Sequence, residues 1–299
     1  MQLKWLEDFV ALAQAQSFSR AAELRHVTHP AFGRRIQALE DWAGTPLVER
    51  GSSPVRLTAA GAALLEHAQD TVRGVGVARE ALQSAAGRQQ RTVTLATGRT
   101  LARTLVAHWL CRHRPLLERE AAEVQIRTRA LAETAQMLEH GEVDFMLTYH
   151  HPVLALRLSA RQFSHLTLTQ DRLVPLSRCD ARGQPQFSLL GGEPAPHLAY
   201  APNLALGRLV DDHLAHHPQA PALRRFVACD SADALLEYAL QGLGVAWLPW
   251  SMAASACQAG HLTPVGDERL QVGFEVRLYR AKRRLQALPE ALWAATLAG

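Results

Sequence analysis

The sequence predicts an all-α N-terminal region, a long linking helix and a C-terminal α/β domain. Three observations predict this division. Apolar residues recur at helical spacing over residues 4–39, and apolar or small residues keep a heptad spacing from Leu57 to Ala85. From residue 91 onward, short strand-like segments alternate with amphipathic helices. The length of 299 residues also favours two or three domains over one.

The composition favours a cytoplasmic protein with a weak preference for a polyanionic partner. The formal charge is +4 and the sequence pI is about 9.1. Charged residues interrupt the N-terminal apolar run, and no stretch reaches the ~20 apolar residues that span a membrane. The four cysteines are widely spaced without a CxxC pair, so we expect neither a zinc site nor a disulfide framework.

The first 58 residues predict a helix-turn-helix. Residues 4–16 form one amphipathic helix, and Ser17 or Ser19 can cap a second. After a turn at His26-Val27, Thr28 can cap a third helix with Pro30 in its first turn. The start of such a third helix suits the DNA major groove. Arg34 and Arg35 lie off its apolar stripe and are candidates for phosphate or guanine contacts, although a solvated helix face explains them equally well.

A short hairpin is expected directly after the third helix. Two apolar segments, 46–50 and 55–58, flank a Gly/Ser/Pro turn. A hairpin in this place is the wing of a winged helix-turn-helix. Arg50 and Arg56 would then reach the sugar-phosphate backbone.

These N-terminal motifs closely resemble the signature of the LysR family of bacterial transcription regulators. The matching runs are Phe18-Ser19-Arg20-Ala21-Ala22, Val27 to Phe32, Arg34 to Glu40, Gly44 to Arg50, and Leu57-Thr58-Ala59-Ala60-Gly61. Many relatives carry Gln at the position of His29 and Ser at that of Gly33, which puts the sequence preference in doubt. The resemblance implies double-stranded DNA as a partner and the following DNA-binding candidates: Ser19, Arg20, Thr28, His29, Pro30, Phe32, Arg34, Arg35, Arg50 and Arg56.

Residues 59–90 are expected to form a dimerisation helix and a hinge. A heptad seam lets two such helices pack together, and it runs through Leu57, Gly61, Leu64, Ala68, Thr71, Val75, Ala78, Leu82 and Ala85. LysR relatives use this segment as a dimerising linker, which implies a homodimer or homotetramer. The alternative is a single helix docked on its own domain. Residues 87–91 would form the hinge.

Residues 91–299 predict βαβ units and a mostly parallel sheet. Strands are expected at 93–96, 124–128, 145–148, 198–200, 226–228, 245–248 and 273–279, with helices at 101–112, 132–140, 206–216, 232–241 and 288–297. This order resembles the LysR effector domain, which is similar to periplasmic solute-binding proteins. The resemblance implies two lobes with crossings near Gln162 and His261: residues 91–162 with 262–299 form lobe one, and 163–261 form lobe two.

The cleft between such lobes is the expected effector site. Ligands of open α/β sheets bind at the carboxyl ends of strands, near helix N-termini. This rule selects Thr97, Arg99, Thr100, Tyr149, His150, Asn203, Ser231, Trp247 and Pro249. Ordinary capping or packing is the competing explanation for each of them. A polar or anionic small molecule is the expected effector.

Other functions are less favoured by the sequence. His213, His216 and His217 share a helix face at metal-ligand spacing, but a solvated helix end is the preferred interpretation, so we predict no metal and no cofactor. An α/β enzyme lacks support because no nucleophile elbow, P-loop or dinucleotide fingerprint is present. Several stretches resemble the hypochlorite-responsive subgroup of the LysR family. The aligned sensing positions hold Leu206 and Ala232 here, and oxidation of Met or Cys remains an alternative.

Overall fold

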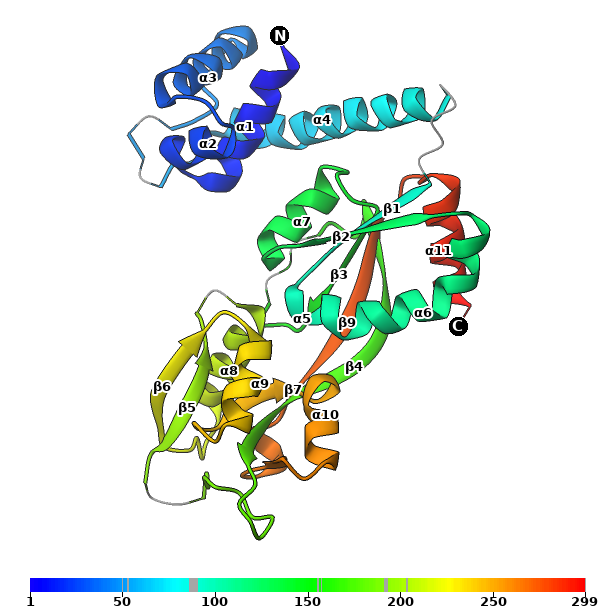
Figure 1. Cartoon of the computed structure of the whole chain (residues 1–299). Helices are drawn as coiled ribbons and strands as arrows, with labels where there is room; N and C mark the ends of the chain where they lie inside the picture. The colour runs from blue at the N-terminus through cyan, green and yellow to red at the C-terminus, as the bar shows by residue number, and fades with distance from the viewer. Residues whose placement is uncertain are drawn as a thin grey trace. The chain divides into compact units, whose positions relative to one another are not determined.

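The computed structural model describes residues 1–49, 51–52, 54–85, 91–154, 156, 158–190, 193–202 and 204–298. It contains two compact units, Met1–Gln90 and Arg91–Gly299, which Figure 1 shows in one view. No helix within the described ranges is long and apolar enough to cross a membrane.

The N-terminal unit packs its helices around one apolar core. The helices are α1 (Leu3–Ala15), α2 (Phe18–Leu24), α3 (His29–Ala43) and α4 (Ala59–Ala85). Ser17 caps α2 by accepting a hydrogen bond from the Arg20 amide. His26 adopts a positive φ of 52° in the turn between α2 and α3. The α2-turn-α3 segment is therefore a helix-turn-helix, as the sequence predicted.

The segment between α3 and α4 contains a short antiparallel bridge. Val48 pairs with Leu57, and the Glu49 amide donates to the Arg56 carbonyl at 2.9 Å. The buried Glu40 carboxylate accepts hydrogen bonds from the Leu47 and Val48 amides at 2.8 and 3.2 Å. This carboxylate therefore ties the base of the hairpin to α3.

The predicted seam of α4 divides into two parts. Gly61 and Ala68 are buried against their own unit, where α4 packs on α1. Farther along the helix, Val75 and Leu82 are 46% and 72% exposed. The first part of the seam is therefore used inside the unit, and the second part is left uncovered. The predicted hinge at 87–91 lies outside the described residues except for Arg91.

The C-terminal unit is built on a mixed sheet with the strand order β2-β1-β3-β9-β4-β7, with β8 also paired to β4. Strands β1 (Thr92–Thr97), β2 (Glu123–Thr128) and β3 (Phe145–His150) are parallel. Helices α6 (Leu105–Arg119) and α11 (Ala287–Leu297) cover one face of these strands, and α7 (Leu131–Glu139) covers the other. The five-residue helix α5 (Arg99–Arg103) precedes α6. These elements form lobe one.

Lobe two surrounds a separate parallel pair, β5 (Ala195–Tyr200) and β6 (Leu223–Cys229). Its helices are α8 (Ala205–His216), α9 (Ala232–Leu240) and α10 (Trp250–Gln258). It also contains β7 (Ala246–Pro249), β8 (Leu262–Pro264) and the 3₁₀ turn Glu268–Leu270. Strand β7 runs antiparallel to β4, so the expected mostly parallel sheet is mixed instead.

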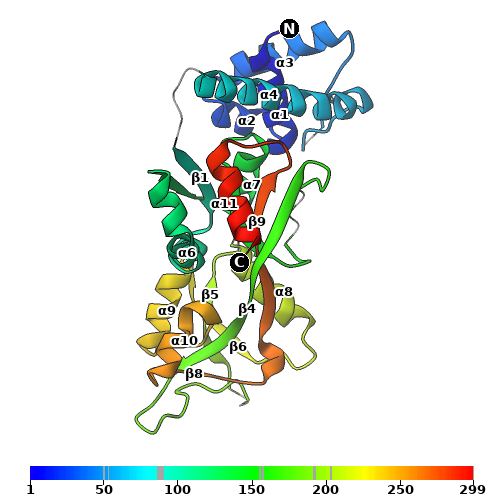
Figure 2. The ribbon, with the colours of Figure 1, turned by 90° about the vertical axis from the view of Figure 1, so that its right-hand side faces the viewer.

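Two long antiparallel strands connect the lobes. The sequence predicted the second of them at 273–279 but did not predict the first. Strands β4 (Phe163–Arg178) and β9 (Val272–Ala281) run side by side from one lobe into the other (Figure 2). Their register shifts between Thr167 and Thr169, near the end of β3. The crossings therefore lie inside these strands, not at Gln162 and His261. Residues 262–270, predicted in lobe one, belong to lobe two because β8 pairs with the far end of β4.

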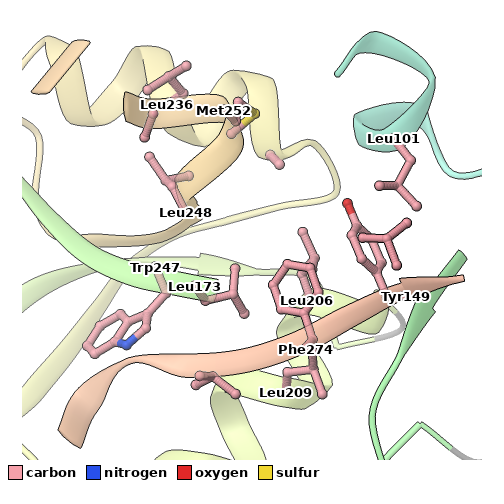
Figure 3. Packing of buried hydrophobic residues seen from close by; sticks show 14 of the residues in the cluster. Leu101, Tyr149, Leu173, Leu206, Leu209, Leu236, Trp247, Leu248, Met252 and Phe274 are labelled. Atoms are coloured by element: carbon pink, nitrogen blue, oxygen red, sulfur yellow. The ribbon is translucent and has the colours of Figure 1, made fainter. Parts of the chain in front are cut away.

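The apolar core is continuous across the two lobes. Figure 3 shows Leu101 and Tyr149 of lobe one approaching Leu206 of lobe two, beside Phe274 of β9. The Tyr149 and Phe274 rings meet edge to face with centroids 5.1 Å apart. The region where the lobes meet is thus partly packed and partly open.

Candidate nucleic-acid interface and ligand cavity

The start of α3 presents an exposed polar surface. Thr28, His29, Pro30 and Arg34 are exposed. Thr28 is the N-cap residue, but its side chain makes no capping hydrogen bond. The amides of His29 and Ala31 are therefore available to an external acceptor such as a phosphate, whereas Pro30 has no N–H and the Phe32 amide donates to the Thr28 carbonyl. Of the other sequence candidates, Ser19, Arg20 and Arg56 are also exposed, and Arg50 lies outside the described residues.

Phe32 is wrong as a DNA contact. Its side chain is fully buried in the core of the N-terminal unit, and its ring meets that of Phe18 edge to face. It therefore positions α3 from inside. The resemblance carried Phe32 into the candidate set because it lies within a signature run, although its place on the apolar stripe indicated burial.

Arg35 is also corrected, because its guanidinium is committed inside the protein. Its Nη1 donates to Asp8 Oδ2 at 3.1 Å, and the Arg25 Nε donates to Asp8 Oδ1 at 2.8 Å. The Asp8 carboxylate is fully buried, while the two arginine side chains are about one-third exposed. A buried carboxylate needs such partners to offset its lost hydration. Arg35 thus ties α3 to α1, whereas Arg34 is exposed on the outer face of α3.

A cavity of about 390 Å³ lies between the two lobes of the C-terminal unit. The N-termini of α5, α7, α8 and α9 converge on it, because each follows the carboxyl end of a parallel strand. The lining residues are Gly98, Arg99, Thr100, Leu101, Thr128, Arg129, Ala130, Leu131, Thr134, Thr148, Tyr149, Tyr200, Leu204, Ala205, Leu206, Asp230, Ser231, Ala232 and Asp233.

Some of the residues predicted for the effector site line the cavity and others do not. Arg99, Thr100, Tyr149 and Ser231 line it. Thr97, His150, Trp247 and Pro249 do not, and Asn203 lies outside the described residues.

Trp247 is wrong as a cleft wall because it belongs to the core of lobe two. The side chain is 1% exposed and its indole N–H donates to the Leu270 carbonyl at 2.8 Å. Val245, directly before β7, pairs in parallel with His197 of β5, so the strand runs in the direction that the strand-end rule assumed. The rule failed here because Trp247 lies inside β7 with its side chain in the apolar core, and Pro249 at the end of the strand is also buried.

Several lining residues were missed. Thr128, Arg129 and Ala130 follow β2, and the same strand-end rule would have selected them. Asp230 and Asp233 flank the selected Ser231. Tyr200 ends β5 and donates its hydroxyl proton to the Trp247 carbonyl at 2.8 Å. Each of these residues lies at a strand end or beside a selected residue, so the sequence could have indicated it. Only the structure shows that its side chain lines the cavity.

Charged residues of the two lobes pair at the cavity. Arg99 Nη2 donates to Asp230 Oδ2 at 3.1 Å, and Arg103 forms an ion pair with Asp233. The Arg129 Nε lies 3.9 Å from Glu133 Oε2 within lobe one. The positive charge of Arg99, a predicted effector-site residue, is thus already balanced by an aspartate.

Tyr149 supplies an unused hydroxyl at the cavity wall. The side chain is 7% exposed, and its hydroxyl has no hydrogen-bond partner among the described residues. The nearby Thr100 side chain lowers the pKa of Tyr149 slightly, although the two groups do not have the geometry of a hydrogen bond. Burial outweighs this effect and raises the pKa of Tyr149, so the hydroxyl stays protonated as a donor.

The metal and oxidation alternatives differ in their support. No group of three or more His, Cys, Asp or Glu residues in the described part of the chain is arranged to hold a metal ion, and His213 and His216 instead contact the Arg269 and Asp212 carbonyls. Met146 and Met252 are 0% and 7% exposed, which shields both from oxidants, but Met137 is half-buried and the Cys111 thiol is exposed, so oxidation of Met or Cys stays an alternative.

Comparisons with known families match both parts of the chain. Residues 3–62 match the bacterial regulatory helix-turn-helix protein, lysR family, and residues 86–298 match the LysR substrate binding domain. These matches cover the helix-turn-helix and the unit that contains the cavity.

Individual relatives are similar over nearly the whole chain. The HTH-type transcriptional regulator YjiE of Escherichia coli is 27% identical over 294 residues, covering 98% of this chain and 93% of YjiE. The crystal structure of Vibrio fischeri DarR in complex with DNA has 27% identity and a TM-score of 0.59, covering 99% of this chain and 98% of DarR. The full-length structure of HypT from Salmonella typhimurium, a hypochlorite-specific LysR-type regulator, has 25% identity and a TM-score of 0.59, covering 99% and 97%.

Proposed function

The chain belongs to the LysR family of DNA-binding transcriptional regulators, and we propose that it binds duplex DNA as a dimer under the control of a small polar or anionic effector. The observation that carries this proposal is the exposed start of α3, with Thr28, His29 and Arg34 beside an uncapped helix N-terminus. We further propose that the protein acts in the cytoplasm, where promoter DNA is accessible.

The proposed DNA contacts are of two kinds, those that recognise bases and those that hold the protein on the DNA backbone. Arg34 lies opposite the buried stripe of α3 and is the candidate for a guanine or phosphate contact. Arg20 and Arg56 lie on α2 and the hairpin and would contact backbone phosphates on either side. The relative DarR was crystallised in complex with DNA, which supports the same use of this region here.

Self-association would use the uncovered part of α4. Val75 and Leu82 are separated by one heptad and are largely exposed, so a second copy of α4 can cover them. A dimer would present two copies of α3 to successive half-sites. Pairing of dimers into a tetramer is part of the same proposal.

The effector would bring hydrogen-bond acceptors into the cavity. Ala130 and Leu204 occupy the N-cap positions of α7 and α8 and have no side-chain oxygen, so the amides that follow are uncapped donors. The Tyr149 hydroxyl is another donor. A carboxylate or a similar oxygen-bearing group matches this set, and Leu101, Leu131 and Leu206 can contact an apolar body.

Binding to fragments of the chain's own promoter region tests the DNA part. We expect a salt-sensitive, sequence-selective complex by fluorescence anisotropy. Arg34→Ala should weaken it, while Arg119→Ala, which removes an exposed arginine of the C-terminal unit, should leave it unchanged. Absence of binding to every fragment would refute the proposal.

A thermal-shift comparison tests the effector part. Small carboxylates and sulfonates are compared with amines of the same carbon skeleton. We expect acids to stabilise the protein and Tyr149→Phe, which keeps the ring and removes the hydroxyl, to reduce the shift. Stabilisation by the amines alone would contradict the donor-lined cavity.

A further inference from the structure

Two ion pairs join the lobes at the cavity. Arg99 Nη2 donates to both Asp230 Oδ2 and the Asp230 carbonyl, at 3.1 and 2.9 Å. Arg103 Nη1 donates to Asp233 Oδ1. The arginines lie on α5 of lobe one, and the aspartates lie at the start of α9 of lobe two (Figure 1). These four side chains are called the inter-lobe latch below.

The spacing of the latch residues lets α5 face the start of α9. Arg99 and Arg103 are four residues apart on α5, and Asp230 and Asp233 are three apart around the N-cap of α9. Arg99 and Arg103 therefore share a face of α5, while Asp230 directly precedes the N-cap of α9 and Asp233 lies in its first turn. The aspartates also lie where the helix dipole favours negative charge. Both pairs therefore form together when the lobes approach and break together when they separate.

The latch forms part of the cavity wall. Arg99, Asp230 and Asp233 line the cavity directly. The lobes are also joined by the apolar contacts near Leu206 and by the hydrogen bond that Arg208 Nη2 donates to the Val153 carbonyl at 3.1 Å. The long strands β4 and β9 connect them covalently and carry a register shift between Thr167 and Thr169. A small change of strand bend at this irregularity would separate α5 from α9 and widen the cavity.

The latch is weak enough to open. The side chains of Arg99 and Asp230 are 60% and 68% exposed, and those of Arg103 and Asp233 are 57% and 35% exposed. Ion pairs in contact with water contribute little and are screened by salt. The latch therefore biases the lobes toward closure without locking them.

We propose that the inter-lobe latch holds the lobes closed over the cavity and that its breakage admits the ligand. The inference rests on the proposed function for the identity of the cavity as the effector site. The closed fraction without ligand then sets the apparent affinity, because an entering molecule must first compete with closure. An acidic ligand that reaches Arg99 competes with Asp230 and so replaces one latch contact by its own.

Hydrogen exchange of the full-length, ligand-free protein tests the latch. The reporter amides are those of Leu131 in α7 and Leu206 in α8, which line the cavity at uncapped helix starts, are shielded from water by burial alone and do not contact the latch. Faster exchange at these amides reports opening of the cavity, whereas fraying of α5 alone would leave them unchanged.

The expected result is that Arg99→Ala combined with Arg103→Ala speeds exchange of the reporter amides about fivefold at low salt. Raising the salt from about 50 mM to about 500 mM should speed exchange in the original protein and have little effect in the double variant. A variant with the charges of one pair exchanged, Arg103→Asp with Asp233→Arg, should exchange the reporter amides as slowly as the original protein does. Arg114→Ala, which breaks an exposed ion pair with Glu118 inside lobe one, is the matched control.

Unchanged exchange in the double variant would overturn the latch, as would a charge-exchanged protein that opens as readily as the double variant. The same samples are assayed for DNA binding. A failed latch with intact, sequence-selective DNA binding leaves the proposed function in place, whereas loss of DNA binding by the unaltered protein refutes that function separately.

Discussion

Replacing Gly61 by alanine should destabilise the N-terminal unit, although alanine is the better helix former. A Cβ at residue 61 would lie 2.0 Å from the Leu47 carbonyl oxygen, and ordinary carbon–oxygen contacts begin near ~3.3 Å. The obstacle is backbone, so no side chain can rotate away. The same carbonyl accepts the Thr58 amide at 3.0 Å, and Thr58 in turn caps α4 through the Gly61 amide. Separating α4 from the hairpin therefore strains the cap as well.

The magnitude follows from two opposing effects. Overpacking costs about 1–3 kcal/mol, and the gain in helix propensity returns about 0.5–1 kcal/mol. We expect Gly61→Ala to lower the free energy of unfolding by about 1 kcal/mol and to weaken DNA binding by displacing the hairpin. Gly74→Ala is the matched control, because a Cβ there meets no atom within 4 Å in the same helix. It should raise stability by about 0.5–1 kcal/mol.

Hydrogen exchange of the α1 amides in the full-length protein measures this effect, because α4 packs on α1. Gly61→Ala should speed exchange and Gly74→Ala should slow it. Equal effects of the two substitutions, or slower exchange in Gly61→Ala, would refute the argument from close backbone approach.

Four further outcomes follow from the described contacts. Asp8→Asn should cost about 2 kcal/mol in urea unfolding, since it leaves two arginines without their buried partner, while the exposed Asp41→Asn should cost little. Gly33→Ala, with no atom within 4 Å of the added Cβ, should raise the melting temperature. Leu82→Asp should shift the protein toward monomer in light scattering without unfolding it. Burial lowers the pKa of His197 from 6.5 to about 4, so stability should fall by at most about 3 kcal/mol as pH drops between those values, and His197→Phe should flatten that profile.

Local patterns explain why much of the fold could be predicted. The spacing of Leu6, Phe9 and Val10 fixes one face of α1, and such periodicity involves only neighbours in sequence. The strand-end rule likewise found Arg99, Thr100 and Tyr149, because each follows or opens a recognisable element.

Contacts between distant segments explain what could not be predicted. The pairing of β4 with β9 joins residues about a hundred positions apart, and nothing in either segment indicates its partner. Trp247 lies in a strand as expected, but packing of that strand between β4 and β5 places its side chain in the core. Arg35 lies off the apolar stripe, yet it donates a hydrogen bond to the carboxylate of Asp8, 27 positions earlier in the chain.

The sequence by itself determined the helix-turn-helix, the linking helix, the alternation of strands and helices, and the resemblance to the LysR family. Each depends on residue types at short spacing. Only the tertiary structure decided which candidate residues face outward, where the chain crosses between lobes, and that Arg99 and Arg103 meet Asp230 and Asp233. Those outcomes depend on strand direction and on the pairing of charges about 130 positions apart, which are set when the whole chain packs.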